Sequence, residues 1–533
     1  MKKKNFVYGI FALMGVFLLF SCDLLSTEAQ KKQFVFDAGK EPYYFVQYNT
    51  SSEKIALQAA GYIESAEIRS ASSQLNAQKT SNSQADFENS AINTPSRGIG
   101  LDLPEDRLLL KISGQSSRSV LDTVSKTICT TQKTSYSVGN KKDFYALYND
   151  TDIRQETFVL KHIGENCLIW YKENDLSNID DSSFSLLGNK FDSIYKMETD
   201  LFGSNKDYEI KYPFAFINNV EDKISIIIFN MNDPSLMGFF LNRDLFKQDS
   251  INTQYNDVKT NEIQAFYLNS VFINDSNLSD AYTTLVHEFQ HMLTFINSYI
   301  SKDSKPETWY TEMLSCLAED IFTNFLELNQ GYEVYSRFIT YIQDSTRGFG
   351  YWNKEDTSAL NASYAGNYAF GAYLFRNFGG VDFLRALTSK DSPGSNIEAI
   401  NYALEKMYET GKISKQETFQ SAADKFYKAF LNTEYTENSN ILSFNKSVTF
   451  ETAGEMLTVK PININELYYS NSKNEVKCYK NGLETFSADP FESGFMYPHG
   501  FTAAYFVYES PYFSNAIFYV SLPSNEKIKF VFE

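Results

Sequence analysis

A His-Glu-x-x-His motif is the part of the sequence whose residue types and spacing point most directly to chemistry. It occupies residues 287–291 in the segment TTLVHEFQHMLTF. Apolar residues recur there at helical spacing, which predicts a helix with one buried stripe. His287 and His291 would stand one turn above each other on one helix face, so that both imidazoles can reach a single metal ion. Glu288 follows His287 round the helix and can act as general base on a metal-bound water, as in zinc peptidases.

Two histidines on a solvated helix face are the plain alternative to a metal site. The chain has four histidines among its 533 residues. A chance motif of this kind is therefore expected in roughly two of a thousand chains of this composition. We interpret the motif as part of a zinc site.

A catalytic zinc site has three protein ligands and one open position for water. The segment TWYTEMLSCLAEDIF predicts a second helix over residues 309 to about 328, and it carries Glu312, 21 positions after His291. That separation allows the first helix to end, a loop to cross and the second helix to return. We expect Glu312 to be the third ligand, because its apolar neighbours predict a buried carboxylate that needs a cationic partner. Three acids nearby are the alternatives: Glu307, Glu319 and Asp320.

The segments VHEFQHML and WYTEMLSCLAED together resemble the glutamate-zincin metallopeptidases, and within them the hyicolysin family. The likeness extends from the strand TFVLKHI to YAFGAYLFRNFGG, roughly half of the chain. It implies a Zn²⁺ ion held by His287, His291 and Glu312, with Glu288 as the catalytic acid/base. It also implies a zincin-like catalytic domain, in which a mixed β-sheet packs on the motif helix and a helical subdomain follows.

The chain departs from this family at one position. In the best-known glutamate zincins, an aspartate one turn after the ligand glutamate orients the first histidine through its second ring nitrogen. Cys316 stands there in this sequence, and a thiol is a poor acceptor. We expect Glu319 or Asp320 to take over this role, which fixes the tautomer and the basicity of the histidine.

Peptide hydrolysis through a tetrahedral intermediate also needs a donor for the developing oxyanion. The run SYAGNYAFGAYLF offers Tyr364 and Tyr368, four apart on one helix face, as candidate catalytic residues. His162 and His499 are candidates by residue type alone. Ordinary core tyrosines, and structural or surface histidines, are the plain alternatives.

The surrounding elements predict an α+β fold. Short apolar runs bounded by turn residues fill residues 101–279 and predict strands: RLLLKI, FYALYN, TFVLKHI, CLIWYK, KISIIIFNM, MGFFLN and EIQAFYLNSVF. One helix is expected at 191–203 within this region. Helical periodicity dominates 280–432, where Ser279 and Asp280 are the expected N-cap pair and further helices are expected at 332–343, 364–378, 381–387, 397–408 and 415–431. The strand-like text of 433–533 predicts a C-terminal β-sandwich-like domain.

The strand EIQAFYLNS comes shortly before the motif helix. If it forms the edge of the sheet, a substrate peptide can pair with it backbone to backbone; a plain interior strand is the alternative. The acidic segment 174–184 lacks the ligand spacing of an EF-hand loop, so a solvated turn is favoured over a calcium site. Cys129 and Cys167 are the favoured disulfide pair, whereas Cys316 is expected to be a buried thiol.

The N-terminus predicts export. Three lysines precede an unbroken apolar run over residues 6–20, which is short for a membrane-spanning helix but suits a signal peptide. The run ends in Leu-Phe-Ser-Cys, which resembles a bacterial lipobox and implies cleavage after residue 21 and acylation of Cys22. A plain signal peptide is the alternative. Residues 22–100 then contain a strand segment and a Ser/Asn/Gln-rich linker, and we expect a lipoprotein tethered to the membrane at the cell surface or periplasmic face.

The composition limits the function further. A formal net charge of −18 repels phosphate backbones, so nucleic acid is not an expected partner. The sequence also contains no phosphate-binding Gly-rich loop and no GxSxG serine motif. We therefore predict a zinc-dependent peptidase, an endopeptidase that acts on extracellular or periplasmic proteins, and leave its oligomeric state open. A surface adhesin or binding lipoprotein with an inert zincin fold is the alternative, motivated by Cys316 and the large C-terminal region. An aminopeptidase is a weaker option, since no acidic cluster for a free amine is evident.

Overall fold

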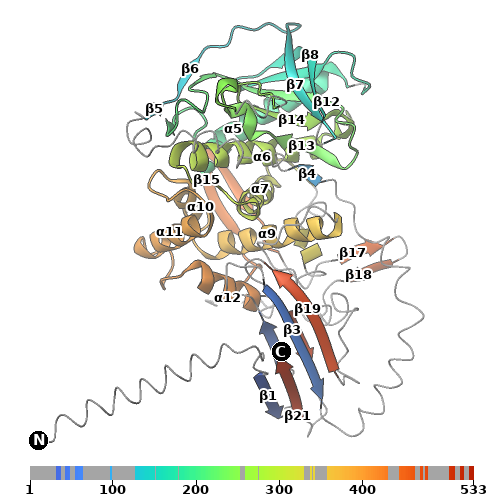
Figure 1. Ribbon diagram of the computed structural model, residues 1–533, viewed down its shortest axis with the longest axis vertical. Coiled ribbons are helices and arrows are strands. Elements are labelled where there is room, and N and C mark those ends of the chain that lie inside the picture. Colours follow the sequence, from blue (N-terminus) through green and yellow to red (C-terminus); the bar gives the residue numbers. More distant parts are fainter. Residues whose placement is uncertain are drawn as a thin grey trace, which may run out of the picture.

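The computed structural model describes residues 126–462, except for 150–151, 178, 252–257, 274, 276, 329–336, 339, 342–356 and 430–442. Outside this range it describes the backbone of the strands β1 to β4 and β17 to β21 (Figure 1). The predicted signal peptide, the linker apart from β4, and the strand RLLLKI lie outside the described residues, as do Cys22, Cys478 and His499. Among the described helices, none is long and apolar enough to cross a membrane.

A mixed seven-stranded sheet forms the first layer of the molecule, with the strand order β4-β13-β14-β12-β9-β8-β7. Strands β9, β12 and β14 run parallel, and β13 pairs antiparallel with β14 at one side. Apart from β4, which falls in the expected linker, these strands match the apolar runs expected from the sequence within the described residues. Their bounds are β4 Ser96–Gly98, β7 Lys141–Tyr148, β8 Asp152–Ile163, β9 Cys167–Lys172, β12 Ile224–Phe229, β13 Leu236–Phe240 and β14 Ala265–Asn269.

Two helices, α5 (Asp181–Phe202) and α6 (Ser279–Thr294), cover one face of the sheet (Figure 1). Strand side chains alternate between faces, so Ile226 and Phe266 pack toward the helices while Ile227 packs in the core on the other face. Phe191 of α5 links the layers, because its ring centroid lies 5.6 Å from that of Phe266 and 5.2 Å from that of Phe289 on α6. The motif helix is thus held against the sheet by aromatic packing.

Several boundaries differ from the expectations; the helix expected from 364, for example, begins at Thr357. Helix α5 begins ten residues before 191, since Phe184 and Leu187 are buried and draw the acidic segment into a first helical turn. Helix α6 has Leu278 at its N-cap, in place of the expected pair, and Asn277 accepts a hydrogen bond from the Ser279 backbone amide at 3.0 Å. Helix α7 (Thr308–Phe322) stops before 328, because the chain turns there and Asn324 donates to the Thr458 carbonyl of a hairpin.

A second layer of helices lies on the side of α6 away from the sheet (Figure 1). It contains α7, α9 (Thr357–Asn377), α10 (Val381–Thr388), α11 (Asn396–Glu409) and α12 (Phe419–Ala429). Helix α6 runs on into a π-helical segment, η6 (Phe295–Ile300). Short 3-10 turns connect the strands at η2 (Asn242–Leu245), η3 (Gln248–Ser250) and η5 (Ser270–Phe272).

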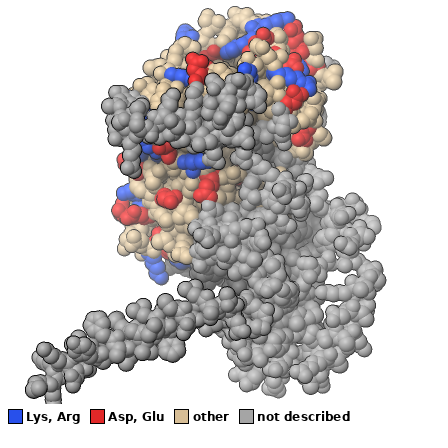
Figure 2. All heavy atoms as spheres, viewed as in Figure 1, with Lys and Arg blue, Asp and Glu red and all other residues tan. Residues whose placement is uncertain are grey.

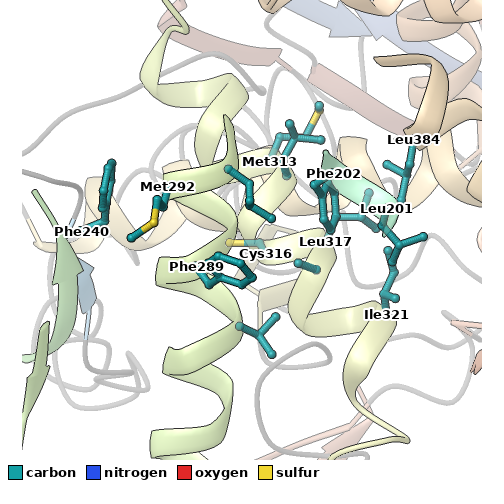
Figure 3. Close-up of a cluster of buried hydrophobic side chains, with 14 of the residues drawn as sticks. Leu201, Phe202, Phe240, Phe289, Met292, Met313, Cys316, Leu317, Ile321 and Leu384 are labelled. Carbon is teal, nitrogen blue, oxygen red and sulfur yellow. The ribbon is translucent and has the colours of Figure 1, made fainter. Parts of the chain in front are cut away.

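The packing of α6, α7 and α9 sets the distance between the helices of the candidate site. Phe289 and Met292 of α6 lie beside Met313 and Cys316 of α7 in one buried cluster (Figure 3). On the other side of α7, Gly371 of α9 comes so close that a Cβ there would lie 3.1 Å from the Met313 carbonyl oxygen. Glycine therefore allows a close helix contact that holds α7 between its neighbours.

The hairpin β15 (Val448–Thr452) and β16 (Glu455–Val459) packs on the helical layer. Phe450 and Val459 are buried in the same core as the helices, and the Arg376 guanidinium of α9 donates to the Lys460 carbonyl at 2.8 Å. Two small pairs complete the described central part: β5 (Thr127–Ile128) with β10 (Glu209–Ile210), and β6 (Thr130–Gln132) with β11 (Asn219–Glu221).

Strands from the two ends of the chain share sheets. One sheet has the order β1-β21-β3-β19, and β2 pairs with β20. Their bounds are β1 Lys32–Asp37, β2 Tyr43–Gln47, β3 Ile55–Ile63, β19 Ala503–Ser510, β20 Ala516–Val520 and β21 Lys527–Phe532; a separate hairpin joins β17 Tyr468–Asn471 and β18 Asn474–Lys477. The fold class is a mixed α+β arrangement, and a C-terminal β-sandwich-like domain at 433–533 stays a prediction.

Two further expectations concern cysteines and surface charge. The favoured disulfide between Cys129 and Cys167 is wrong, because both are buried thiols in the structure, while Cys316 is the buried thiol that its apolar helix predicts. On the face seen in Figure 2, basic and acidic side chains are interspersed over the described surface. Some of the exposed charges of the described residues form ion pairs, as Lys196 does with Glu165 at 2.9 Å.

Candidate metal centre

His287, Glu288 and His291 lie within two neighbouring turns of helix α6, and Glu312 of helix α7 lies opposite them. All four side chains are buried, and His291 alone among them keeps 6% of its surface exposed. Burial follows from the layers described above, since α6 lies between the sheet and α7. The structure therefore places three potential ligands and one potential base from distant parts of the sequence in a single buried region.

The donor atoms of three of these residues converge. The two imidazole Nε2 atoms of His287 and His291 lie 3.1 Å apart. Glu312 places Oε2 at 3.3 Å from Nε2 of His287 and Oε1 at 3.2 Å from Nε2 of His291. One donor atom from each residue falls within 4.8 Å of the others, which is a spacing that can hold one ion.

These spacings fit a tetrahedral metal better than they fit direct hydrogen bonds. In a tetrahedral zinc site with bond lengths of about 2.0–2.1 Å, neighbouring ligand atoms stand about 3.3 Å apart. Direct charge-assisted N–H···O bonds are shorter, at about 2.7–2.9 Å. The distances of 3.1, 3.2 and 3.3 Å between Nε2 of His287, Nε2 of His291 and the Glu312 oxygens match the first value. A donor set of two imidazoles and one carboxylate also suits a divalent transition metal.

Both histidines are oriented through their second ring nitrogen. Nδ1 of His287 lies 2.6 Å from Oε1 of Glu319. An ionised carboxylate can only accept a hydrogen bond, so the ring nitrogen is the donor. Nδ1 of His291 lies 3.1 Å from Oγ of Ser315, and that hydroxyl donates its proton to Oε1 of Gln290 at 2.5 Å. When each imidazole is neutral, its single ring proton therefore lies on Nδ1, and its Nε2 keeps a lone pair for a metal.

Charges in the site indicate where a cation would bind. Burial by itself lowers the pKa of His287, but the neighbouring carboxylates of Glu312 and Glu319 outweigh burial and raise the pKa to about 9. Burial lowers the pKa of His291, and the neighbouring His287 adds to that decrease. Burial would raise the pKa of Glu312, yet the two histidines lower it to about 2. In the metal-free protein His287 thus carries a second ring proton, on Nε2, beside the ionised carboxylate of Glu312, in the place where a metal ion would supply the positive charge.

The two candidate tyrosines have different surroundings. Burial raises the pKa of Tyr364 well above its ordinary value, and the charges of Glu312 and Glu288 add to this effect, so Tyr364 lies within electrostatic reach of the centre. The Tyr368 hydroxyl instead donates to Oδ2 of Asp320 at 3.1 Å, and Arg376 donates to the same oxygen at 2.8 Å. Tyr368, a candidate catalytic residue, and Asp320, a candidate partner of His287, therefore both lie in a buried network with Arg376.

Glu319 occupies the role that was expected of either Glu319 or Asp320. It reaches His287 although Cys316 stands one turn closer to the ligand glutamate, and Cys316 lies in the same cluster with His287 and Glu319. The one additional methylene of glutamate relative to aspartate, and its position two turns after Glu312, let Glu319 reach His287. His162 does not belong to this cluster. It is part of strand β8, its ring lies against Gly188 of α5, and burial lowers its pKa.

For the strand EIQAFYLNS, an edge position and a plain interior position were both open from the sequence, and the structure shows the interior position. Strand β14 is interior, because it pairs with β12 on one side and with β13 on the other. Strand β13 lies nearer the edge and carries β4 as its outer neighbour. A peptide that adds to this side of the sheet would meet β4 first, because β13 already pairs with β14 on one side and with β4 on the other. The short apolar run AFYL within EIQAFYLNS was the signal for a strand buried on both faces.

Four residues of the site were not singled out from the sequence. Ser315 and Gln290 orient His291, and Arg337 donates to Glu319 at 3.0 Å. Gly238 on β13 faces the motif helix, where a Cβ would lie 3.7 Å from Cγ of Glu288. A glycine inside the apolar run MGFFLN is a signal of close backbone approach. Ser315, Gln290 and Arg337 have no local signal, because their hydrogen bonds in the site join residues that are far apart in the sequence.

A family model matches the segment that holds the centre, and a curated protein resembles about half of the chain. Residues 172–435 match the family model described as Peptidase M30. The chain is 24% identical over 262 residues to a protein named neutral metalloprotease ShpI from Staphylococcus hyicus. The match covers 46% of this chain and 53% of that relative, so the chain spans about half the length of the curated relative it matches. Both comparisons agree with the hyicolysin-type resemblance, and the relative's name implies a metal.

Proposed function

We propose, from the Peptidase M30 match over residues 172–435, that this chain is a zinc-dependent peptidase that cleaves peptide bonds of proteins. The observation that carries the proposal is the convergence of His287, His291 and Glu312 at distances of 3.1 to 3.3 Å. A metal in that position would lie beside Glu288, the residue after the first ligand on the same helix.

The proposed chemistry uses the residues of the centre as follows. His287, His291 and Glu312 would hold Zn²⁺, which when bound polarises a carbonyl and lowers the pKa of a coordinated water toward about 7. Glu288 accepts the proton of the attacking water and delivers it to the leaving amine. Tyr364 donates a hydrogen bond to the developing oxyanion, a role supported by its high pKa, because a hydroxyl that stays protonated can always donate.

Zinc is supported over other metals by the donor set. Two neutral imidazoles and one carboxylate, with hydrogen bonds fixed behind each ring, are the ligands of catalytic zinc in metallopeptidases. Magnesium and calcium prefer sites built from oxygen alone. Within the described residues, the His287, His291 and Glu312 group is the cluster with two imidazole donors.

The place of action and the substrate belong to the same proposal. The basic and apolar N-terminus with its Leu-Phe-Ser-Cys end supports an exported lipoprotein anchored through Cys22, on the cell surface or periplasmic face. Extracellular or periplasmic proteins are then the accessible substrates, and endopeptidase action is proposed because no acidic cluster for a free amine was evident in the sequence.

The alternative of an inert adhesin rested on the missing aspartate at Cys316 and on the large C-terminal region. Since Glu319 lies 2.6 Å from Nδ1 of His287, the contact that the aspartate would make is present. This observation favours the enzyme.

Casein hydrolysis by the full chain tests the proposal. We expect zinc-dependent cleavage that a chelator abolishes and that Glu288→Gln lowers by several orders of magnitude. Glu198→Gln is a matched control, because Glu198 is also a fully buried glutamate, on α5, and burial raises its pKa well above the ordinary value. If Glu288→Gln cleaves casein as fast as the parent, the proposed mechanism is wrong.

A further inference from the structure

Arg337 binds the carboxylate behind the metal centre with both ends of its guanidinium. Its Nη1 donates to Oε2 of Glu319 at 3.0 Å and its Nη2 donates to Oε1 at 3.1 Å. This is the bidentate geometry in which arginine fixes both oxygens of a carboxylate at once. Glu319 keeps 1% of its side chain exposed and Arg337 keeps 14%, so the pair is shielded from water.

The same carboxylate contacts a candidate metal ligand. Oε1 of Glu319 receives Nη2 of Arg337 on one side and lies 2.6 Å from Nδ1 of His287 on the other. The Nε2 atom of that ring faces Glu312 at 3.3 Å. Arg337, Glu319 and His287 therefore form a continuous line of contacts that ends in the metal centre.

We propose that Arg337 is a positioning residue for the metal centre, which acts through Glu319 on His287. The role rests on the proposed function, because it requires a metal between the two histidines and Glu312. A single carboxylate on a flexible side chain can rotate and offer either oxygen at various angles. The guanidinium fork removes that freedom, so that Oε1 stays against Nδ1 and the ring stays turned toward the metal.

A buried carboxylate also needs a cationic partner in order to remain ionised. Glu319 lies in a region that already contains the buried carboxylates of Glu288 and Glu312. Arg337 supplies the balancing charge from the side away from the metal. Glu319 can then accept a hydrogen bond from Nδ1 of His287, which increases the basicity of Nε2 on the same ring.

The position of Arg337 is itself held by packing. The next residue, Phe338, is fully buried, and its ring centroid lies 4.7 Å from that of Phe444. The backbone that carries Arg337 is thus anchored beside α7. A purely structural role would be to tie this segment to α7 through Glu319, and the experiment must separate this role from the positioning one.

The discriminating variant is Arg337→Lys. Removing the positive charge altogether would by itself favour a cation at the centre, which would mask a loss of positioning. Lysine keeps the charge and loses the fork. We expect Arg337→Lys to bind zinc about 10- to 100-fold more weakly in competition with a chelator. We also expect the visible spectrum of the Co²⁺-loaded protein to change, because the geometry of the ligand ring changes.

Arg376→Lys is the matched control. Arg376 pairs with Asp320 at 2.8 Å, and Asp320 is the residue next to Glu319 on α7. Asp320 contacts Tyr368 and does not orient a histidine. This control should lose thermal stability to a similar extent, with the zinc dissociation constant and the Co²⁺ spectrum of the parent.

A double-mutant cycle keeps the inference testable even if Arg337→Lys is unstable. If Arg337 acts through Glu319, the effect of Arg337→Lys on zinc affinity disappears in a Glu319→Gln background. Equal zinc affinity and an unchanged Co²⁺ spectrum in folded Arg337→Lys would overturn the inference, as would effects of the two substitutions that simply add. A parent protein that binds no zinc would instead overturn the proposed function.

Discussion

Gly238 on β13 lies directly against Glu288 on α6. A Cβ at Gly238 would stand 3.7 Å from Cγ of Glu288 and 2.6 Å from both Cγ2 of Thr284 and the Tyr267 carbonyl oxygen. The strand and the motif helix can approach this closely only because residue 238 has no side chain. The position of the proposed base is therefore set from the sheet as well as from its own helix.

Gly238→Ala should shift α6 and with it Glu288. Because one of the two contacts at 2.6 Å is a backbone oxygen on the neighbouring strand, the clash has no cheap relief, and we expect a loss of about 1–3 kcal/mol in the free energy of unfolding. We also expect a lower kcat per folded molecule, measured on a peptide substrate alongside thermal denaturation. Gly188→Ala is the control, since a Cβ there meets His162 at 2.2 Å on α5 and β8, and it should destabilise without changing kcat. Equal kcat in the two variants would contradict the role of Gly238.

Metal affinity should depend on pH through His287. Its pKa in the metal-free protein is raised to about 9, whereas the pKa of His291 is lowered and that of Glu312 is about 2. At neutral pH a metal must therefore displace one proton, from His287. We expect the apparent dissociation constant to fall about tenfold for each pH unit between about 6.5 and 9, as measured by chelator competition.

The same shift predicts the pH dependence of the metal-free protein. A raised pKa stabilises the folded state fully below the ordinary value of 6.5 and loses that contribution as the pH rises through about 9. The metal-free protein should thus melt at a lower temperature at pH 9 than at pH 6.5, and bound metal should remove most of this difference. A zinc affinity that is constant from pH 6.5 to 8.5 would show that His287 is not protonated.

Ser315→Ala should weaken the metal site through His291. The Ser315 hydroxyl lies 3.1 Å from Nδ1 of His291 and donates to Gln290, and its loss leaves the ring without a partner at that nitrogen. We expect about a tenfold or larger rise in the zinc dissociation constant. Ser298→Ala is the control, because Ser298 is a buried serine whose hydroxyl donates to the Gly394 carbonyl at 2.7 Å. If both variants bind zinc equally, Ser315 has no role in ligand orientation.

The two tyrosines should respond in opposite ways to loss of the hydroxyl. Tyr364→Phe removes the proposed oxyanion donor and should lower kcat on the order of a hundredfold with little change in KM. Tyr368→Phe breaks the bond to Asp320 and should lower the melting temperature while kcat stays within a few-fold of the parent. Steady-state kinetics and thermal denaturation of both variants test the assignment. A larger kcat loss in Tyr368→Phe would reverse it.

Much of the centre could be predicted from local sequence. The spacing of His287, Glu288 and His291 on one helix follows from helical periodicity, which neighbouring residues encode by themselves. Glu312 could be proposed because apolar neighbours predict burial, and a buried carboxylate needs a partner. The strands around residues 144–148, 167–172 and 224–229 were also readable, since runs of apolar residues between turns are a local signal.

The sequence by itself thus determined the motif helix, the residue types of the metal centre and the α+β class, all of which depend on residues close together in the chain. Only the tertiary structure decided that Glu319 supports His287 while Asp320 turns to Arg376, because adjacent residues on α7 point to different neighbours once α6 and α9 pack against it. The interior place of β14 and the contact of Arg337 with Glu319 likewise depend on strand order and helix crossing. These are set by packing between distant segments, for which no short stretch of sequence carries a signal.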